Sequence, residues 1–175
     1  MGNMFYTSDL HIGHRNIQKY RTNIDSTEHN TSWIETEWIR RVRKRDTIWC
    51  LGDNAFTEEG IDFLAGLPGT KIMIGGNHDD LPTSSYLRAF KEVYGCRSAK
   101  GLGWVTHIPM HEQEFHRRRA NVHGHVHYNS IPDKRYVNVC CDNLWENTGS
   151  PLITLSQLRH TINTRVEPGD IKFYL

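Results

Sequence analysis

Three short apolar runs, each closed by a cluster of polar residues, constrain the fold of this chain most. The runs cover residues 4–7, 47–51 and 71–74, and the sequences S-D-L-H, G-D-N and G-G-N-H-D-D follow them. Helical spacing of apolar residues predicts helices at 26–44 and 57–67, between the runs. Strands that alternate with helices are typical of a layered α/β fold. Because ligands in such folds lie beyond the carboxyl ends of the strands, we expect the three polar clusters to converge on one site.

The second half of the chain differs, because its short apolar pieces are separated by polar turns with few helical signals. Strands are expected at 104–106, 121–122, 136–140 and 152–153, and helices at 85–93 and 154–162. The chain shows no repeat, low-complexity tract or linker, and its 175 residues suit one core. We therefore expect a single α/β domain over residues 1–175.

Composition narrows the class of protein. The net charge is only +1, so no overall field draws the chain onto nucleic acid or a membrane. No apolar stretch reaches the roughly 20 residues that span a bilayer, and the N-terminus lacks a basic start followed by an apolar run. The four cysteines have no C-x-x-C spacing and are expected to be reduced, buried thiols. These features predict a cytoplasmic protein, and its 11 histidines hint at metal binding.

Five short motifs built from His, Asp and Asn carry the chemistry. They are D-L-H at 9–11, G-D-N at 52–54, G-N-H-D at 76–79, T-H-I-P at 106–109 and G-H-V-H at 124–127. A lone D-x-H or G-D has little meaning, but all five in this order, four of them after apolar runs, form a specific pattern. The pattern resembles that of the calcineurin-like metallophosphoesterase superfamily, over residues 4 to about 160.

Two further stretches resemble the small bacterial and bacteriophage members of that superfamily. The first motif continues as D-L-H-I-G-H-R-N-I over residues 9–17. The sequence V-N-V-C-C-D at 137–142, followed by Pro151 and Leu152, is similar to the last core strand of that group. The resemblance implies a single-domain, four-layer α/β/β/α sandwich of the metallophosphoesterase type.

The resemblance also implies two divalent cations, bridged by Asp53. One cation would be held by Asp9, His11, Asp53 and His127, and the other by Asp53, Asn77, His107 and His125. Imidazole, carboxylate and amide ligands suit manganese, iron, zinc or nickel better than magnesium or calcium, and manganese is favoured. Asp79 and Asp142 are expected to accept the second N–H of ligand histidines.

The activity implied is hydrolysis of a phosphate ester by water that the metals activate. His78 matches the non-ligand histidine of the family and is expected, together with the bridging Asp53, to act in catalysis. His14 and Asn16, which follow the first motif, are candidate phosphate contacts. Arg117 and Arg118, in a basic run between the fourth and fifth motifs, are further candidates because guanidinium groups pair with phosphate.

Small phosphodiesters, especially cyclic or linear nucleotides, are the favoured substrates. Alternatives are a phosphomonoesterase or protein phosphatase, a nuclease acting on long nucleic acid, and a non-catalytic interaction scaffold of the same fold. The near-zero net charge argues against the nuclease, and the intact ligand set with His78 argues against the scaffold. Trp33 and Trp38 are most simply core residues, whereas Trp145 is a less favoured candidate for stacking on a base. The sequence indicates no oligomeric state.

Overall fold

The computed structural model describes residues 2–166. The first half of this stretch, together with one strand from near its end, β9 (Ile153–Thr154), forms a mainly parallel sheet. Four of its strands run in parallel and β9 is antiparallel to β1, in the order β4-β3-β2-β1-β9. The strands are β1 (Met4–Thr7), β2 (Thr47–Leu51), β3 (Thr70–Ile74), β4 (Glu92–Tyr94) and β9 (Ile153–Thr154). The helices of this half are η1 (Ile17–Lys19), α1 (Thr27–Arg41), α2 (Glu58–Gly66) and α3 (Thr83–Tyr86).

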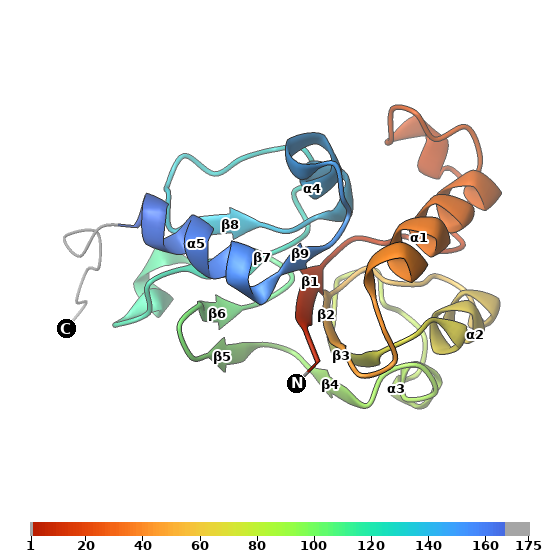
Figure 1. The fold of residues 1–175 in the computed structure, drawn as a ribbon, viewed down its shortest axis with the longest axis horizontal. Coiled ribbons are helices and arrows are strands. Elements are labelled where there is room, and N and C mark those ends of the chain that lie inside the picture. The colour runs from red at the N-terminus through yellow and green to blue at the C-terminus, as the bar shows by residue number, and fades with distance from the viewer. Residues whose placement is uncertain (1, 167–175) are drawn as a thin grey trace.

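A second sheet of four strands follows, in the order β5-β6-β7-β8. β6, β7 and β8 are parallel, and β5 pairs antiparallel with β6. Its elements are β5 (Arg97–Ala99), β6 (Gly103–Val105), η2 (Glu112–Phe115), β7 (Asn121–His123), β8 (Tyr136–Asn138), α4 (Cys141–Thr148) and α5 (Leu155–Arg165). Helices α1, α2 and α3 gather beside the first sheet, and α4 and α5 beside the second (Figure 1).

Two hydrophobic clusters bury both faces of the first sheet. On one face, Phe5 and Met73 pack with Ile34 of α1 and Leu64 of α2. On the other face, side chains of β1, β2 and β3 pack with β6, β7, β8 and α5. They include Tyr6, Leu51 and Ile74 against Val105, Val122, Val137, Leu158 and Ile162. Burial on both faces explains why these strands read as nearly continuous apolar runs.

The three apolar runs form the strands expected of them, and β3 begins only one residue early, at Thr70. The expected helix at 26–44 ends at Arg41, where the backbone of Val42 becomes extended. The expected helix at 85–93 is wrong, because α3 ends at Tyr86 and residues 92–94 pair with β3 as the edge strand β4. Pairing with an existing strand outweighs the helical spacing of the apolar residues there.

The strand expected at 136–140 is too long, since β8 ends at Asn138. Helix α4 follows and was not expected, so residues 141–142 belong to a helix rather than to the last core strand. Its sequence, C-D-N-L-W-E-N-T, contains few strong helix formers, and the left-handed Gly149 that ends it is the clearest local signal. No helix among the described residues is long and apolar enough to cross a bilayer.

Candidate metal centre

The seven expected ligands lie just beyond the carboxyl ends of parallel strands in both sheets. Each polar loop begins within two or three residues of its strand, so the sheets deliver the side chains to one place. Asp9 and His11 follow β1, Asp53 follows β2, Asn77 follows β3, His107 follows β6, and His125 and His127 follow β7.

The backbone of these loops is left-handed at five of the seven positions. Seven non-glycine residues in the described chain have a positive φ, and five of them are expected ligands: Asp9 (57°), His11 (52°), Asp53 (52°), His125 (73°) and His127 (50°). Such conformations cost on the order of 1–3 kcal/mol each and persist where surrounding contacts hold them. Here the amides of Asp9 and His11 donate to the carbonyls of Gly52 and Asp53, both at 3.0 Å. These hydrogen bonds between the strained loops after β1 and β2 therefore stabilise both loops.

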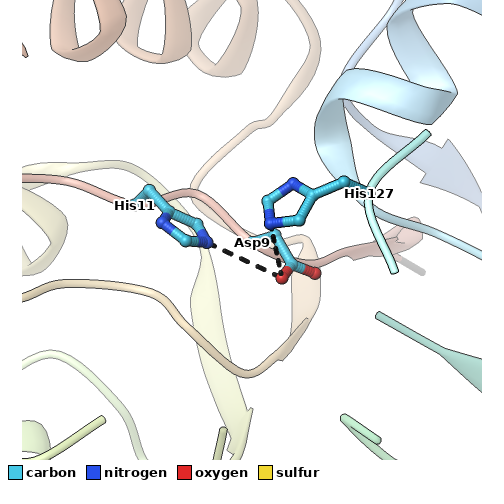
Figure 2. Close-up of side chains that lie close together, drawn as sticks. All are labelled: Asp9, His11 and His127. Carbon is cyan, nitrogen blue, oxygen red and sulfur yellow. Dashed lines mark ion pairs between the residues drawn. The ribbon is translucent and has the colours of Figure 1, made fainter. Parts of the chain in front are cut away.

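Asp9, His11 and His127 form the first group of ligand atoms, which Figure 2 shows gathered around the carboxylate. Asp9 Oδ1 lies 3.7 Å from His11 Nε2 and 3.9 Å from His127 Nε2. His11 Nε2 is also 3.8 Å from Asp53 Oδ2. Ligand atoms bound about 2.1 Å from one cation lie roughly 3–3.5 Å apart. These atoms therefore surround a space close to the size that a divalent cation needs.

The second group of ligand atoms faces the other oxygen of Asp53. Asp53 Oδ1 is 3.4 Å from His107 Nε2. Asn77 Oδ1 lies 2.9 Å from His107 Nε2 and 2.9 Å from His125 Nδ1. The two oxygens of Asp53 thus point toward different sets of ligand atoms, which is the arrangement that a bridging carboxylate requires.

Buried polar atoms without partners test whether a cation fits. Asp9 Oδ2 accepts hydrogen bonds from the His125 amide at 2.9 Å and from the Cys140 thiol at 3.0 Å. Among the described residues, Asp9 Oδ1 and both ring nitrogens of His11 are buried with no hydrogen-bond partner. Buried polar groups are almost always satisfied, so the orphaned oxygen and imidazole fit a bound divalent cation.

Hydrogen bonds on the far side of two rings aim their Nε2 atoms into the site. His127 donates from Nδ1 to Asp142 Oδ2 at 2.7 Å, and His107 donates from Nδ1 to the Leu51 carbonyl at 2.7 Å. Outer contacts of this kind fix the tautomer and orientation of metal-binding histidines. The expected role of Asp142 as an acceptor is confirmed.

The expected role of Asp79 as a histidine partner is wrong. Its carboxylate accepts three backbone amides instead, from Asp53 at 2.8 Å, Asn54 at 2.9 Å and Gly76 at 2.8 Å. Asp79 therefore ties the loop after β2 to the loop after β3. It shapes the second group of ligands through the backbone rather than through an imidazole.

The electrostatics favour ionised carboxylates at the centre. Burial alone would raise the pKa of Asp9, but the neighbouring His11 and His107 and the hydrogen bonds it accepts lower it overall. Burial likewise opposes a low pKa at Asp53, yet the contact with His107 lowers it. At His11, burial lowers the pKa and keeps the ring neutral. Neutral imidazole beside ionised carboxylate is the state that binds divalent metal.

Arg21 is a buried cation beneath the centre that sequence reasoning missed. Its Nε faces Asp142 Oδ2 at 3.5 Å, and Nη1 donates to the Leu10 carbonyl at 3.2 Å. Its guanidinium also donates to the Asp9 carbonyl and to Asn30 Oδ1. The arginine sits in a polar stretch of sequence, so its burial leaves no local signal.

Phe56 is a second unanticipated residue, and it lies among the histidines of the site. Its ring centroid is 5.1 Å from those of His11 and His14 and 5.9 Å from that of His78. The only signal in the sequence is its position two residues after G-D-N. The phenyl ring is an apolar support for imidazoles on both sides of the centre.

A cavity of about 390 Å³ opens over the ligands, and both His14 and His78 line it. The expected substrate contacts therefore divide into two groups. Asn16 is exposed and precedes η1, outside the lining. Arg117 and Arg118 are exposed after η2, also outside the lining, and the Arg118 guanidinium lies over the Trp104 ring at 5.7 Å. Phosphate contact by these three residues stays a prediction that the geometry does not support.

Comparison with known proteins places the chain among phage proteins. The Gene 66 protein of Mycobacterium phage D29 is 39% identical over 206 aligned positions, which cover 97% of this chain and all of that protein. The Gene 66 protein of Mycobacterium phage L5 is 37% identical over 84 positions, and this match spans 45% of the chain and 41% of that protein. No family model matches the chain.

A more distant sequence match and a solved structure complete the comparison. The uncharacterized protein MJ1445 of Methanocaldococcus jannaschii is 25% identical over 144 positions, covering 79% of this chain and 77% of that protein. The crystal structure of AQ665, a protein of unknown function from Aquifex aeolicus, superposes with a TM-score of 0.69 at 23% identity. That superposition covers 91% of this chain and 99% of AQ665, so the two proteins share a mixed α/β fold.

Proposed function

The chain belongs to the family of the mycobacteriophage Gene 66 proteins, and we propose that it is a phosphoesterase that requires two divalent metal ions and hydrolyses small phosphodiesters. The observation that carries this proposal is the Asp53 carboxylate, whose oxygens face His11 at 3.8 Å and His107 at 3.4 Å. A carboxylate shared in this way, amid His and Asn ligands, suits two transition-metal ions, of which manganese is the first choice.

The proposal assigns the chain to the calcineurin-like metallophosphoesterase superfamily. Two sheets that share a core, with helices beside each of them, support the four-layer α/β/β/α sandwich of that family (Figure 1). The five motifs in their order support the same assignment.

When bound, two divalent cations would supply a water that ionises near neutral pH and positive charge for the phosphoryl oxygens. His78 lies beside Asp53, because its amide donates to Asp53 Oδ1 at 3.0 Å while its exposed side chain lines the cavity. From there its imidazole stabilises developing charge or protonates the leaving oxygen. Burial lowers the pKa of His14 across the cavity, so that ring acts near pH 7 as a neutral hydrogen-bonding group.

The lining of the cavity favours a diester over a monoester. Among the described residues that line it, no Arg or Lys is present. A monoester carries up to two negative charges and is usually held by guanidinium or ammonium groups, whereas a diester carries one. The nearby Arg21 is buried and committed to protein acceptors, so it does not supply that charge.

The proposal is tested by hydrolysis of bis-p-nitrophenyl phosphate and p-nitrophenyl phosphate with Mn²⁺. We expect the diester to be the better substrate, activity to disappear with a chelator and Mn²⁺ to restore it. Asp53→Asn should lose both bound metal and activity, whereas Asp62→Asn, an exposed carboxylate on α2, should keep both. Hydrolysis that persists after complete metal removal would refute the proposal, and a preference for the monoester would favour the phosphomonoesterase alternative.

A further inference from the structure

A second, smaller cavity of about 220 Å³ lies directly beside the one over the metal centre. No described residue lines both cavities, but His127 of the first donates a hydrogen bond to Asp142 of the second at 2.7 Å, and at two points consecutive residues line one cavity and the other. Tyr20 lines the first cavity and Arg21 the second, while His127 lines the first and Tyr128 the second. A molecule held at the metal centre therefore has this cavity within reach of its substituents.

Three aromatic side chains in the lining of the second cavity form a corner. Trp33 of α1 and Trp145 of α4 meet with ring centroids 5.5 Å apart and planes at 87°. Tyr128, which follows the ligand His127, lines the same cavity. Trp145 and Tyr128 are 36% and 37% exposed as residues, so both present aromatic surface to an incoming group. A flat ring that enters such a corner stacks on one wall and meets another edge on.

The buried charges of this cavity are already committed to one another. Arg21 and Asp142 are its deep charged groups, and they pair at 3.5 Å. The remaining donors of the guanidinium go to protein acceptors, namely Leu10 O, Asp9 O, Asn30 Oδ1 and Cys141 Sγ. At the rim, His29 Nδ1 lies 2.9 Å from the Asp25 carboxylate. This electrostatic environment suits a neutral ring better than a second phosphate.

The volume of the second cavity limits the size of the group that it can bind. Pockets for whole drug-sized ligands occupy roughly 300–1,000 Å³. A cavity of about 220 Å³ therefore accommodates one ring system of a molecule that is bound mainly in the adjacent cavity. We propose that this aromatic corner is a nucleobase subsite, which receives the base of a nucleotide whose phosphate lies at the metal centre. The inference rests on the proposed function and specifies its substrate class as nucleoside phosphodiesters.

The test compares adenosine 2′,3′-cyclic phosphate with base-free ribose 2,3-cyclic phosphate, using the Mn²⁺-loaded protein. We expect the wild type to prefer the nucleotide. Trp145→Ala should lower kcat/KM for the nucleotide by roughly tenfold, the size of one lost base–aromatic stack, mainly through KM. The base-free substrate should be unaffected. Trp145→Phe, which keeps a ring, should recover most of the loss, and Leu87→Ala, an exposed apolar residue just after α3, should change neither substrate.

Three results would overturn the subsite while leaving the hydrolase proposal intact. They are equal wild-type activity on both substrates, an equal loss on both in Trp145→Ala, or a change of oligomeric state in that variant, which would mean that a second copy covers the corner. If Trp145→Ala does not fold, Tyr128→Ala takes its place with the same expected selectivity, because Tyr128 is partly exposed on the same cavity.

If the wild type hydrolyses neither substrate, the proposed function is contradicted. The subsite is then tested by binding alone. Calorimetric titration of the Mn²⁺-loaded protein with adenosine then decides. Saturable binding that is lost in Trp145→Ala and kept in Leu87→Ala supports the subsite, and absence of binding by the wild type overturns it.

Discussion

Among single residues, Asp142 links the candidate metal centre to the buried interior. Its Oδ2 accepts a hydrogen bond from His127 Nδ1 at 2.7 Å and lies 3.5 Å from Arg21 Nε. Burial would raise the pKa of Asp142, but His127 and Arg21 lower it, so the carboxylate stays ionised. Its charge therefore orients one expected ligand and offsets that of Arg21, a residue that is only 3% exposed.

We predict that Asp142→Ala lowers the affinity for Mn²⁺ by about 10- to 100-fold, because His127 loses the acceptor that orients its ring. Titration calorimetry of the metal-free protein measures this directly. Asp62→Ala removes an exposed carboxylate from α2 and should keep wild-type affinity. Unchanged Mn²⁺ affinity in Asp142→Ala would show that the hydrogen bond does not support the ligand.

The proposed catalytic role of His78 can be tested separately from metal binding. Its backbone amide donates to Asp53, and alanine keeps that amide. His78→Ala should therefore lower kcat for bis-p-nitrophenyl phosphate by roughly 10²–10⁴, the usual contribution of general-acid catalysis. The content of bound metal, measured by elemental analysis, should match the wild type. A parallel loss of metal would instead identify His78 as a ligand.

The gathering of Asp9, His11, Asp53 and Asn77 was predictable, because polar side chains that follow neighbouring parallel strands meet at one sheet edge. The convergence of the three histidines of the second sheet with them was expected only from the family resemblance. The distances confirm that they come together, while metal binding itself stays a prediction. Arg21 was not predictable, since its acceptors include two backbone carbonyls and the distant Asp142 side chain, which only the fold brings near. Burial of a charge in a polar stretch is a property of tertiary structure, not of local sequence.

Among the elements, the strands were easier to predict than the helices. β1 and β2 are apolar on both faces and lie inside the sheet, so their sequences alone mark them. The edge strand β4 has partly buried residues throughout, and only its pairing with β3 defines it. Tertiary context also explains why α4 was not predicted. Its polar sequence becomes helical between the end of β8 and the left-handed Gly149.

The loops after β1 and β7 approach each other so closely that one glycine is required. A Cβ on Gly124 would overlap the Ser8 hydroxyl and lie 2.5 Å from Asp9 Oδ2. Gly124→Ala should therefore destabilise the protein by about 1–3 kcal/mol, the usual cost of overpacking, and weaken Mn²⁺ binding by displacing Asp9. Urea unfolding and metal titration measure the two effects.

The matched control is Gly66→Ala at the end of α2. A Cβ there would meet nothing within 4 Å, and alanine is the better helix former. This variant should gain up to about 1 kcal/mol of stability and bind Mn²⁺ normally. Equal behaviour of the two variants would show that the close approach of Gly124 to Asp9 is unimportant.

Across the whole molecule, the site straddles two sheets. Asp9, His11, Asp53 and Asn77 come from loops of the first sheet, and the other three expected ligands from loops of the second. Their mutual distances therefore depend on how the sheets pack through the shared core around Tyr6 and Val122. Strand order and sheet packing are long-range properties, which no local pattern in the sequence specifies.

This arrangement predicts that metal binding stabilises the entire fold, because the ligands form one site only when both sheets are packed together. A cation that binds only the native state adds about 2.7 kcal/mol at a concentration 100 times its Kd. For a domain of this size the melting temperature should rise by roughly 5–10 °C with Mn²⁺, and less with Mg²⁺, which prefers oxygen ligands. Thermal unfolding followed by circular dichroism, with and without a chelator, measures the shift. Asp53→Asn removes the shared carboxylate charge and should melt at the same temperature in both conditions, so a full Mn²⁺ shift in that variant would place the metal elsewhere.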